Sequence, residues 1–370
     1  MKVERIASID EFVSLADEWD DLLEKSGQAN VFLTHEWMLS WWKVYGDGGN
    51  LFILICRSVE NGALVGILPL YRKREGYFPR VNILRFIAGS NVGSDFLEPI
   101  FLPNSHQQIF EAFFEFLNKI IYKWDVIEFS SVDVDSIFYH VLNDKKNKFL
   151  KFNQYDSQLC PYVNLPESWE EMLTSLSKKV RQKVGYYRRS LDRNSSYEIL
   201  RVTNETELKD SLDYLMHIRK DRLEAKGIEF DKVSSLYKKF HEKIMKSFLN
   251  KGWLNLYFLK LRNKPVAFVY QFVFQGRVFF YQTGFDRTYS AQSVGFVLLG
   301  HVIEHVIDEK YKIFEFLRGD EGYKYDWGRI NARKISDITI CSSSTLSKIY
   351  ISKNMLKKKL IIRLKNVFKK

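Results

Sequence analysis

The segment FDRTYSAQSVGF spans Phe285 to Phe296 and joins an expected strand at residues 278–283 to an expected helix at residues 293–308. The first N–H groups of a helix have no partners within it and point, with the positive end of the helix dipole, to one place. That place suits a pyrophosphate, and Gly295 would allow close approach of a ligand to the backbone. The plain alternative is an ordinary strand-to-helix turn, since short glycine patterns recur by chance.

The elements around this segment follow an order that the chain shows twice. Apolar residues three and four apart predict helices, whereas short apolar runs predict strands. The first half gives two helices, three strands, a helix and a strand, at residues 9–16, 35–45, 51–56, 64–70, 81–88, 106–122 and 126–130. The second half repeats this order at residues 208–222, 233–250, 253–261, 266–274, 278–283, 293–308 and 313–317, before a closing strand at 335–342. The repeat predicts two domains of one mixed α/β fold.

The chain of 370 residues is long enough for two cores of ordinary size. Pro161 and Pro166 place the crossing between them near residues 162–169. We therefore expect an N-terminal domain at residues 1–165, a C-terminal domain at residues 166–345 and a tail helix at residues 346–370. The three cysteines lie far apart in the sequence, which predicts idle thiols rather than a zinc site.

The net charge of +11 is concentrated in two segments. Residues 178–193 predict a helix with one apolar and one basic side, which suits either an anionic partner or a merely solvated surface. Residues 347–370 contain no acidic residue and predict a basic amphipathic helix, which could lie on an anionic membrane surface or pack back on its domain. No apolar run spans a bilayer and no signal peptide is evident. We expect a cytoplasmic protein, with peripheral binding at the inner face of the membrane as an option for the tail.

Several sequence blocks together resemble the GNAT acyltransferases, and in particular their CelD-like, cellulose-biosynthesis-type branch with two GNAT-like halves. In the second half these blocks are YQTGFD at 281–286, then Ser293 and Gly295, and then FLRGDEGYK at 316–324. In the first half they are FLTHEW at 32–37 and GILPL at 66–70. The resemblance implies a tandem GNAT-like fold. The N-terminal half would be a degenerate copy, because its strand-to-helix loop lacks the Gln-x-x-Gly anchors.

The resemblance places the acyl donor in the turn quoted above. It implies that acetyl-CoA or another acyl-CoA contacts a set of turn residues, namely Asp286, Gln292, Ser293, Val294, Gly295 and Phe296. Gln292 and Gly295 match the first two anchors of the family pattern Gln/Arg-x-x-Gly-x-Gly/Ala. Val297 stands at the third anchor, where the family has a small residue.

Acyl transfer requires a base that deprotonates the acceptor and an acid that protonates the departing thiolate. The resemblance implies Glu321 or Asp320 as the base and Tyr323 as the acid, with Glu315 on the preceding strand as a further candidate. The two acidic loop residues could equally pair with the basic residues beside them. Four residues are expected to contact the substrate: Trp37, Tyr281, Arg318 and Lys324.

No metal site is predicted. His301 and His305 lie four residues apart on an expected helix, a spacing that can hold a metal, but spacing names no third ligand. The sequence also contains no Gly-x-Ser-x-Gly elbow and no P-loop, which argues against a serine hydrolase and a nucleotide kinase.

Three functions follow as hypotheses. The first is transfer of an acetyl or other acyl group from acyl-CoA to an amine or hydroxyl of a sugar or cell-envelope precursor, an acceptor class that rests on the resemblance alone. The second follows from a distant resemblance to the FemABX aminoacyl transferases, which have paired GNAT-like halves and take their acyl group from charged tRNA. The basic helix at 178–193 would then bind the tRNA. The third is a noncatalytic, membrane-associated factor of polysaccharide synthesis that uses the basic tail.

Overall fold

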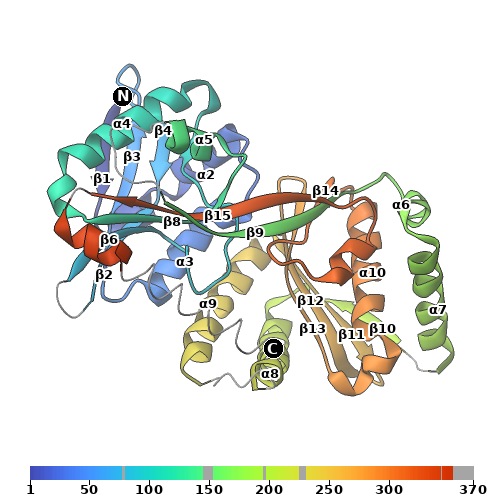
Figure 1. Ribbon diagram of the computed structural model, residues 1–370. Coiled ribbons are helices and arrows are strands. Elements are labelled where there is room, and N and C mark those ends of the chain that lie inside the picture. Colours follow the sequence, from blue (N-terminus) through green and yellow to red (C-terminus); the bar gives the residue numbers. More distant parts are fainter. Residues whose placement is uncertain (77–79, 145–152, 195–196, 225–230, 343, 353–370) are drawn as a thin grey trace. The chain divides into compact units, whose positions relative to one another are not determined.

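The computed structural model describes residues 1–76, 80–144, 153–194, 197–224, 231–342 and 344–352 (Figure 1). Contacts divide the chain into two compact units. Unit 1 comprises residues 1–28, 46–157 and the described part of 336–370, and unit 2 comprises residues 29–45 and 158–335. The helix at residues 35–45 therefore belongs by its contacts to unit 2, although most of unit 1 follows it in the sequence.

Unit 1 contains two groups of hydrogen-bonded strands. One group has the order β1 (Lys2–Ile6), β3 (Ile53–Arg57), β4 (Leu64–Leu68) and β7 (Ile100–Phe101). The other has the order β15 (Asn331–Cys341), β8 (Val126–Asp133), β6 (Val81–Phe86), β5 (Leu70–Glu75) and β2 (Gly49–Leu51). The helices of this unit are α1 (Ile9–Ser14), α2 (Ala16–Ser26), α4 (His106–Lys119) and α5 (Ile137–Asp144).

Helix α4 packs on the first of these strand groups through an apolar side that contains Ile109 and Phe113. Gly66 on β4 makes this packing possible, because a Cβ there would lie 2.5 Å from Cγ2 of Ile109. The apolar residues of α4, which recur every three or four positions, thus lie on a single buried side of the helix, as the sequence predicts.

Unit 2 carries the repeated order of elements that includes the segment from Phe285 to Phe296, which we call the donor turn after its expected ligand. Its strands are ordered β10 (Tyr197–Arg201), β11 (Leu254–Leu261), β12 (Lys264–Phe274), β13 (Arg277–Phe285), β14 (Ile313–Glu315) and β9 (Asn153–Asn164). Its helices are α3 (His35–Tyr45), α6 (Trp169–Ser175), α7 (Lys178–Asn194), α8 (Glu205–Glu224), α9 (Asp231–Asn250) and α10 (Val294–Asp308). The short 3-10 helices η4 (Arg287–Gln292) and η5 (Gly322–Asp326) lie in the connections around α10 and β14.

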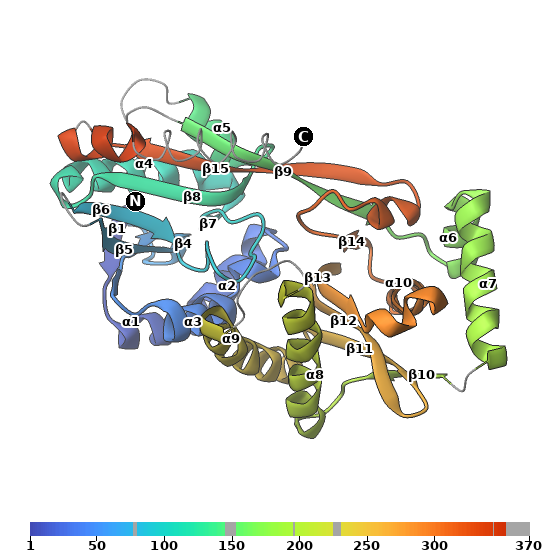
Figure 2. The ribbon, with the colours of Figure 1, turned by 60° about the horizontal axis from the view of Figure 1, so that its bottom comes forward.

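The sheet of unit 2 is covered on both faces. Helices α8 and α9 lie on one face of β11, β12 and β13, and α10 lies on the other (Figure 2). The strands alternate accordingly: Leu259 faces the core around α10, whereas Phe258 contacts Tyr214 of α8 with 5.7 Å between ring centroids. Helix α10 is apolar around most of its circumference because α6 and α7 cover its outer side.

The predicted mixed α/β architecture is confirmed, and the strands and helices of both repeats lie near their expected positions. Several strands were not predicted from the sequence, namely β1, β5, β7, β9 and β10. Strand β9 reaches Asn164, where a connection was expected, and α6 begins after Ser168, whose Oγ accepts a hydrogen bond from the N–H of Glu171 at 3.2 Å.

The expected tail helix is described only at its start. Residues 345–352 are helical, and Leu346, Tyr350 and Ile351 pack against buried residues of β6 and β8. The remainder of the tail, residues 353–370, lies outside the described residues. Within the described parts of the chain, no helix is both long and apolar enough to cross a membrane.

Candidate functional site

Strands β13 and β14 are paired over only part of their length. Their parallel pairing ends at Phe279 and Glu315, where β14 stops. Strand β13 continues to Phe285, and β12 is the only described strand that pairs with this extension. The chain beyond β14 turns to β9 instead, because the N–H of Phe316 donates to the carbonyl of Pro161 at 2.9 Å. The last part of β13 therefore has one open edge, and such an edge offers backbone N–H and C=O groups to a ligand.

The turn between β13 and α10 is shaped by its own side chains. Asp286 accepts hydrogen bonds from Oγ1 of Thr288 at 2.7 Å and from its N–H at 3.0 Å, and these bonds lower the pKa of the Asp286 carboxyl. The 3-10 helix η4 ends at Ser293, whose φ of +51° directs the chain into α10. The N–H groups of Val294 and Gly295 start the helix and therefore have no acceptor within it.

The sequence anchors of this turn occupy different environments. Gln292 is exposed. Gly295 packs against the end of β13, because a Cβ there would lie 3.1 Å from Cδ1 of Phe285. Val297 is only 2% exposed and contributes to the core around α10. The departure from the family pattern at Val297 thus faces the core around α10.

A lysine of α7 brings positive charge to the start of α10. The ammonium of Lys183 lies 4.1 Å from the centroid of the Phe296 ring, which in turn stacks on Trp327 at 5.0 Å. Lys183 also lies 3.9 Å from the carboxylate of Asp326. Lys183 could not be assigned to the donor turn from the sequence, because α7 is far from the turn along the chain. A lysine beside the first turn of a helix strengthens the attraction of that turn for a phosphate.

Lys324 organises the loop that follows β14. Its buried ammonium donates to the carbonyls of Leu317, Arg318 and Gly319 at 3.3, 2.9 and 3.1 Å, and it pairs with Glu321 at 2.9 Å. The backbone has positive φ at Leu317 (+58°) and Gly319 (+113°), and a Cβ at position 319 would lie 2.5 Å from Oε2 of Glu321. Lys324 and Glu321 therefore form an ion pair of the kind that the sequence leaves open as the alternative to a catalytic role.

Asp320 and Tyr325 form an accessible polar pair in the same loop. The hydroxyl of Tyr325 donates a hydrogen bond to the Asp320 carboxylate, and this bond raises the pKa of Tyr325. Both side chains are exposed, as is that of Tyr323. A carboxylate that holds a tyrosine hydroxyl can accept a proton from a substrate group brought next to it.

Glu315 lies inside unit 2 rather than at its surface. Its carboxylate is 0% exposed, and Oε1 accepts hydrogen bonds from Arg277 and from Arg333, each at 2.7 Å. The other oxygen, Oε2, is buried without a hydrogen-bond partner among the described residues. These contacts form an ion-pair network inside unit 2, in which Glu315 holds both Arg277 and Arg333.

Tyr281 belongs to an aromatic cluster on the face of the sheet that α9 covers. Its hydroxyl lies 3.4 Å from Nε2 of His241, whose Nδ1 lies 3.0 Å from the hydroxyl of Tyr270. Trp37 of α3 is fully buried in this cluster, 5.8 Å from Tyr281 between ring centroids. Tyr281 as a residue is half-buried, and its hydroxyl lies inside the cluster.

The electrostatics of this cluster follow from its burial. Burial, with the charge of Arg219 as a smaller cause, holds the pKa of His241 well below its ordinary value, so the imidazole is neutral. Burial also holds the pKa values of Tyr281 and Tyr270 well above theirs. A neutral imidazole has one nitrogen that donates and one that accepts, and it can therefore link two tyrosine hydroxyls.

The sequence alone assigns no role to His241. One available signal was its spacing from Tyr237, four residues earlier on α9, which puts both rings on one side of the helix. The two rings are indeed in contact, with 4.0 Å between centroids. The sequence could not show that β13 would bring Tyr281 to the same place.

Histidine and acidic residues do not gather into a metal site in the parts of the chain that the structure describes, since no three potential ligands converge. His301 and His305 project from α10 and bond to other groups: Nε2 of His301 lies 3.2 Å from the hydroxyl of Tyr197, and Nε2 of His305 lies 3.0 Å from Arg201.

Comparison with known proteins identifies the segment that holds the turn and the loop. Residues 178–325 match the family model described as an acetyltransferase (GNAT) domain. In fold, the chain is similar to FemX, at 12% identity and a TM-score of 0.64, over 94% of this chain and 99% of that one. It is also similar to L-PGS from Bacillus licheniformis, at 12% identity and a TM-score of 0.52, over 90% and 94%. No curated protein sequence matches the chain.

Proposed function

Because residues 178–325 form a GNAT-type acyltransferase domain, we propose that this chain moves an acyl group from acyl-CoA to an amine or hydroxyl acceptor. The observation that carries this proposal is the open end of β13. The strand loses its partner β14 at Phe279 and runs on, with β12 as its one described partner strand, into the turn before α10, where the half-buried Gly295 lies in the first turn of the helix. An extended donor arm can bond to the open edge of β13 while its pyrophosphate meets the first amides of α10 and Lys183.

Acyl transfer breaks the C–S bond of a thioester while the acceptor forms a new bond to the acyl carbon. The acceptor loses a proton, and the departing thiolate gains one. We assign the base to Asp320, which is exposed and keeps its position through Tyr325. Glu321 and Glu315 are weaker candidates, because the first is paired with Lys324 and the second is buried between arginines.

We assign the acid to Tyr281. Its raised pKa keeps the hydroxyl protonated, the residue lies on the part of β13 that extends beyond β14, and its hydroxyl contacts His241. The tyrosinate that remains after proton transfer to the thiolate takes up the proton that the acceptor released, while the neutral imidazole of His241, which also contacts Tyr270, keeps the hydroxyl oriented. Tyr323, exposed in the loop of Asp320, is the second candidate for the acid.

The acceptor class that we propose is a sugar or a cell-envelope precursor. This finer proposal, like a role in polysaccharide synthesis and the CelD-like branch itself, rests on the sequence blocks at 281–286 and 316–324. We also propose a cytoplasmic location. The tail would add contact with an anionic membrane surface through residues 353–370, which lie outside the described residues.

The test is a thermal-shift screen of the full chain with acetyl-CoA, longer acyl-CoAs and CoA. A ligand that binds only the folded protein raises its melting temperature as the ligand concentration rises. We expect a rise with CoA and a larger one with its best acyl ester. The absence of any rise would contradict the donor assignment.

Charged tRNA is the second candidate donor, and α7 favours it. The outer side of α7 exposes Lys178, Lys179, Arg181 and Arg189 beside Tyr186, which is 62% exposed. Arg188 is not part of this surface, because it pairs with Glu304 at 2.7 Å and lies over the ring of Trp169. Neutralising the four exposed residues would abolish salt-sensitive binding of tRNA if this candidate is right and would leave CoA binding unchanged.

A further inference from the structure

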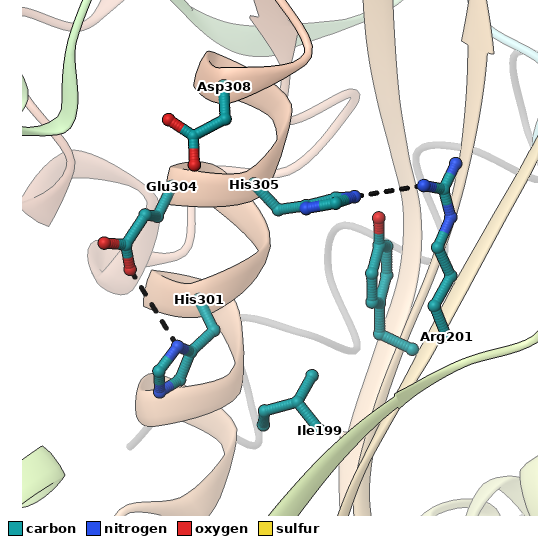
Figure 3. A pocket seen from close by; sticks show the side chains of 7 residues that line it. Ile199, Arg201, His301, Glu304, His305 and Asp308 are labelled. Carbon is teal, nitrogen blue, oxygen red and sulfur yellow. Dashed lines mark hydrogen bonds and ion pairs between the residues drawn. The ribbon is translucent and has the colours of Figure 1, made fainter.

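A pocket of about 320 Å³ lies beside the second half of α10. Its walls include Ile199 and Arg201 from β10, Tyr257 from β11, and His301, Glu304 and Asp308 from α10 (Figure 3). We call it the α10 pocket. In Figure 3, His301, Glu304 and Asp308 extend from successive turns of the helix, and the ring of His305 points toward Arg201.

The α10 pocket is separate from the donor turn. Helix α10 starts at Val294, His301 lies near its middle and Asp308 is its last residue. At about 1.5 Å per residue, these two residues lie roughly 10 and 20 Å from Val294 along the helix axis. A ligand in this pocket would thus touch the same rigid helix as the donor without competing for its amides. An inference about this pocket does not depend on the proposed reaction.

Tyr257 offers a hydrogen-bond donor to a ligand. The residue is 3% exposed, and its hydroxyl is buried without a hydrogen-bond partner among the described residues. Nδ2 of the neighbouring Asn255 is also buried without a hydrogen-bond partner among the described residues, while its Oδ1 accepts a hydrogen bond from Arg201 at 2.6 Å. A buried hydroxyl without a partner is costly, and an oxygen acceptor placed in the pocket would remove that cost.

Some charged residues of the pocket are compensated by ion pairs, and one is not. Arg201 is paired with Glu309 at 2.6 Å, and Glu304 is paired with Arg188 at 2.7 Å. Asp308 is exposed and has no ion pair within the described parts of the chain. Burial, helped by the charge of Arg188, lowers the pKa of His301 to about 4, so this imidazole adds no positive charge near neutral pH.

We propose that the α10 pocket binds a small molecule with an ammonium group close to an oxygen acceptor, as free amino acids and amino sugars have. The uncompensated carboxylate of Asp308 would bind the ammonium. The hydroxyl of Tyr257 would donate to the oxygen, and Ile199 would contact the carbon skeleton. The pocket volume is large enough for one such molecule, and one apolar wall with a few polar groups is typical of ligand sites.

Calorimetric titration of the full chain tests this inference. The probes are L-serine and D-glucosamine, each compared with its N-acetyl form, which keeps the oxygens and lacks the ammonium. We expect at least one amine to bind and its N-acetyl form not to bind, and the amine that binds shows which of the two sources fits. Asp308→Asn should weaken that binding at least about tenfold and Tyr257→Phe severalfold. Asp210→Asn, which removes an exposed carboxylate of α8, is the matched control.

Three outcomes would overturn the inference. They are no binding of either amine, equal binding of the N-acetyl forms, and equal affinities for Asp308→Asn and Asp210→Asn. Neither key variant should unfold the protein, because Asp308 is exposed and the Tyr257 hydroxyl has no partner to lose. A titration with CoA, which should be unchanged in Asp308→Asn, separates failure of this site from failure of the donor turn.

Discussion

The hydroxyl of Tyr281 lies 3.4 Å from Nε2 of His241, so a half-buried residue at the open edge of β13 contacts a fully buried imidazole. The imidazole is neutral because burial lowers its pKa, and its other nitrogen contacts Tyr270 at 3.0 Å. A tyrosine held in this way stays protonated and keeps a fixed orientation. Both properties are required of the group that protonates a departing thiolate.

Tyr281→Phe is therefore expected to lower kcat by about 10²-fold with little change in KM for the donor, since the lost hydroxyl acts on the leaving group and not on binding. The measurement is thiol release from acetyl-CoA with the best acceptor found in a panel of amines and alcohols. Tyr122→Phe, at a tyrosine that is 77% exposed in unit 1, is the control. An unchanged kcat in Tyr281→Phe would transfer the role to Tyr323.

Stability is expected to depend on the protonation of His301. Its folded pKa is about 4, below the ordinary value of 6.5, so between these values the unfolded chain binds a proton that the folded chain does not. The contribution is complete above the unfolded pKa and is lost as the pH falls toward 4, by about 2 kcal/mol between about pH 8 and about pH 5. Urea unfolding of the wild type and of His301→Gln at both pH values measures it. Equal pH dependence in both proteins would show that His301 does not contribute.

Glu315→Gln is expected to destabilise the protein by about 2 to 4 kcal/mol. The change removes the negative charge that Arg277 and Arg333 share. Both guanidiniums remain partly exposed to solvent, which limits the loss of stability. Glu321→Gln, whose carboxylate is half exposed, should cost less than about 1 kcal/mol. Chemical denaturation of both variants makes the comparison, and equal costs would show that the buried network does not stabilise unit 2.

Two buried tyrosines should respond in opposite ways to loss of the hydroxyl. Tyr237 donates to Oε1 of Gln282 at 2.6 Å, so Tyr237→Phe leaves that amide oxygen unpaired and should cost about 1 to 2 kcal/mol. The hydroxyl of Tyr257 has no partner among the described residues, so Tyr257→Phe should be neutral or slightly stabilising without ligand. The free energies of unfolding of the two variants test this, and a cost for Tyr257→Phe equal to that for Tyr237→Phe would contradict it.

The sequence allowed the fold to be predicted where one face of an element is buried. Helix α4 and strands β11 to β13 show regular apolar patterns, and they lie close to where those patterns place them. Strand β9 was missed because its sequence, NQYDSQLCPYVN, mixes polar residues with a proline and has no regular alternation. It is a strand because tertiary pairing with β14 provides its partners, from Tyr162 to Asn164.

The site was predictable only in its local parts. The turn from Asp286 to Phe296 and the loop from Asp320 to Lys324 are continuous in sequence and were assigned as such. The contact of Lys183 with Phe296 depends on how α7 packs against α10, which no spacing encodes. The role of Lys324 could not be predicted from the sequence either, because a lysine near glycines does not indicate that three carbonyls will accept hydrogen bonds from its ammonium.

The donor turn is the central claim, and calorimetric titration with CoA tests it most directly. We expect the wild type to bind CoA and Lys183→Met to bind it at least about fivefold more weakly, because the ammonium beside the helix start is lost. Lys209→Met, which removes an exposed lysine of α8, should bind like the wild type. No heat of binding in the wild type, or equal affinities for the two lysine variants, would contradict the account.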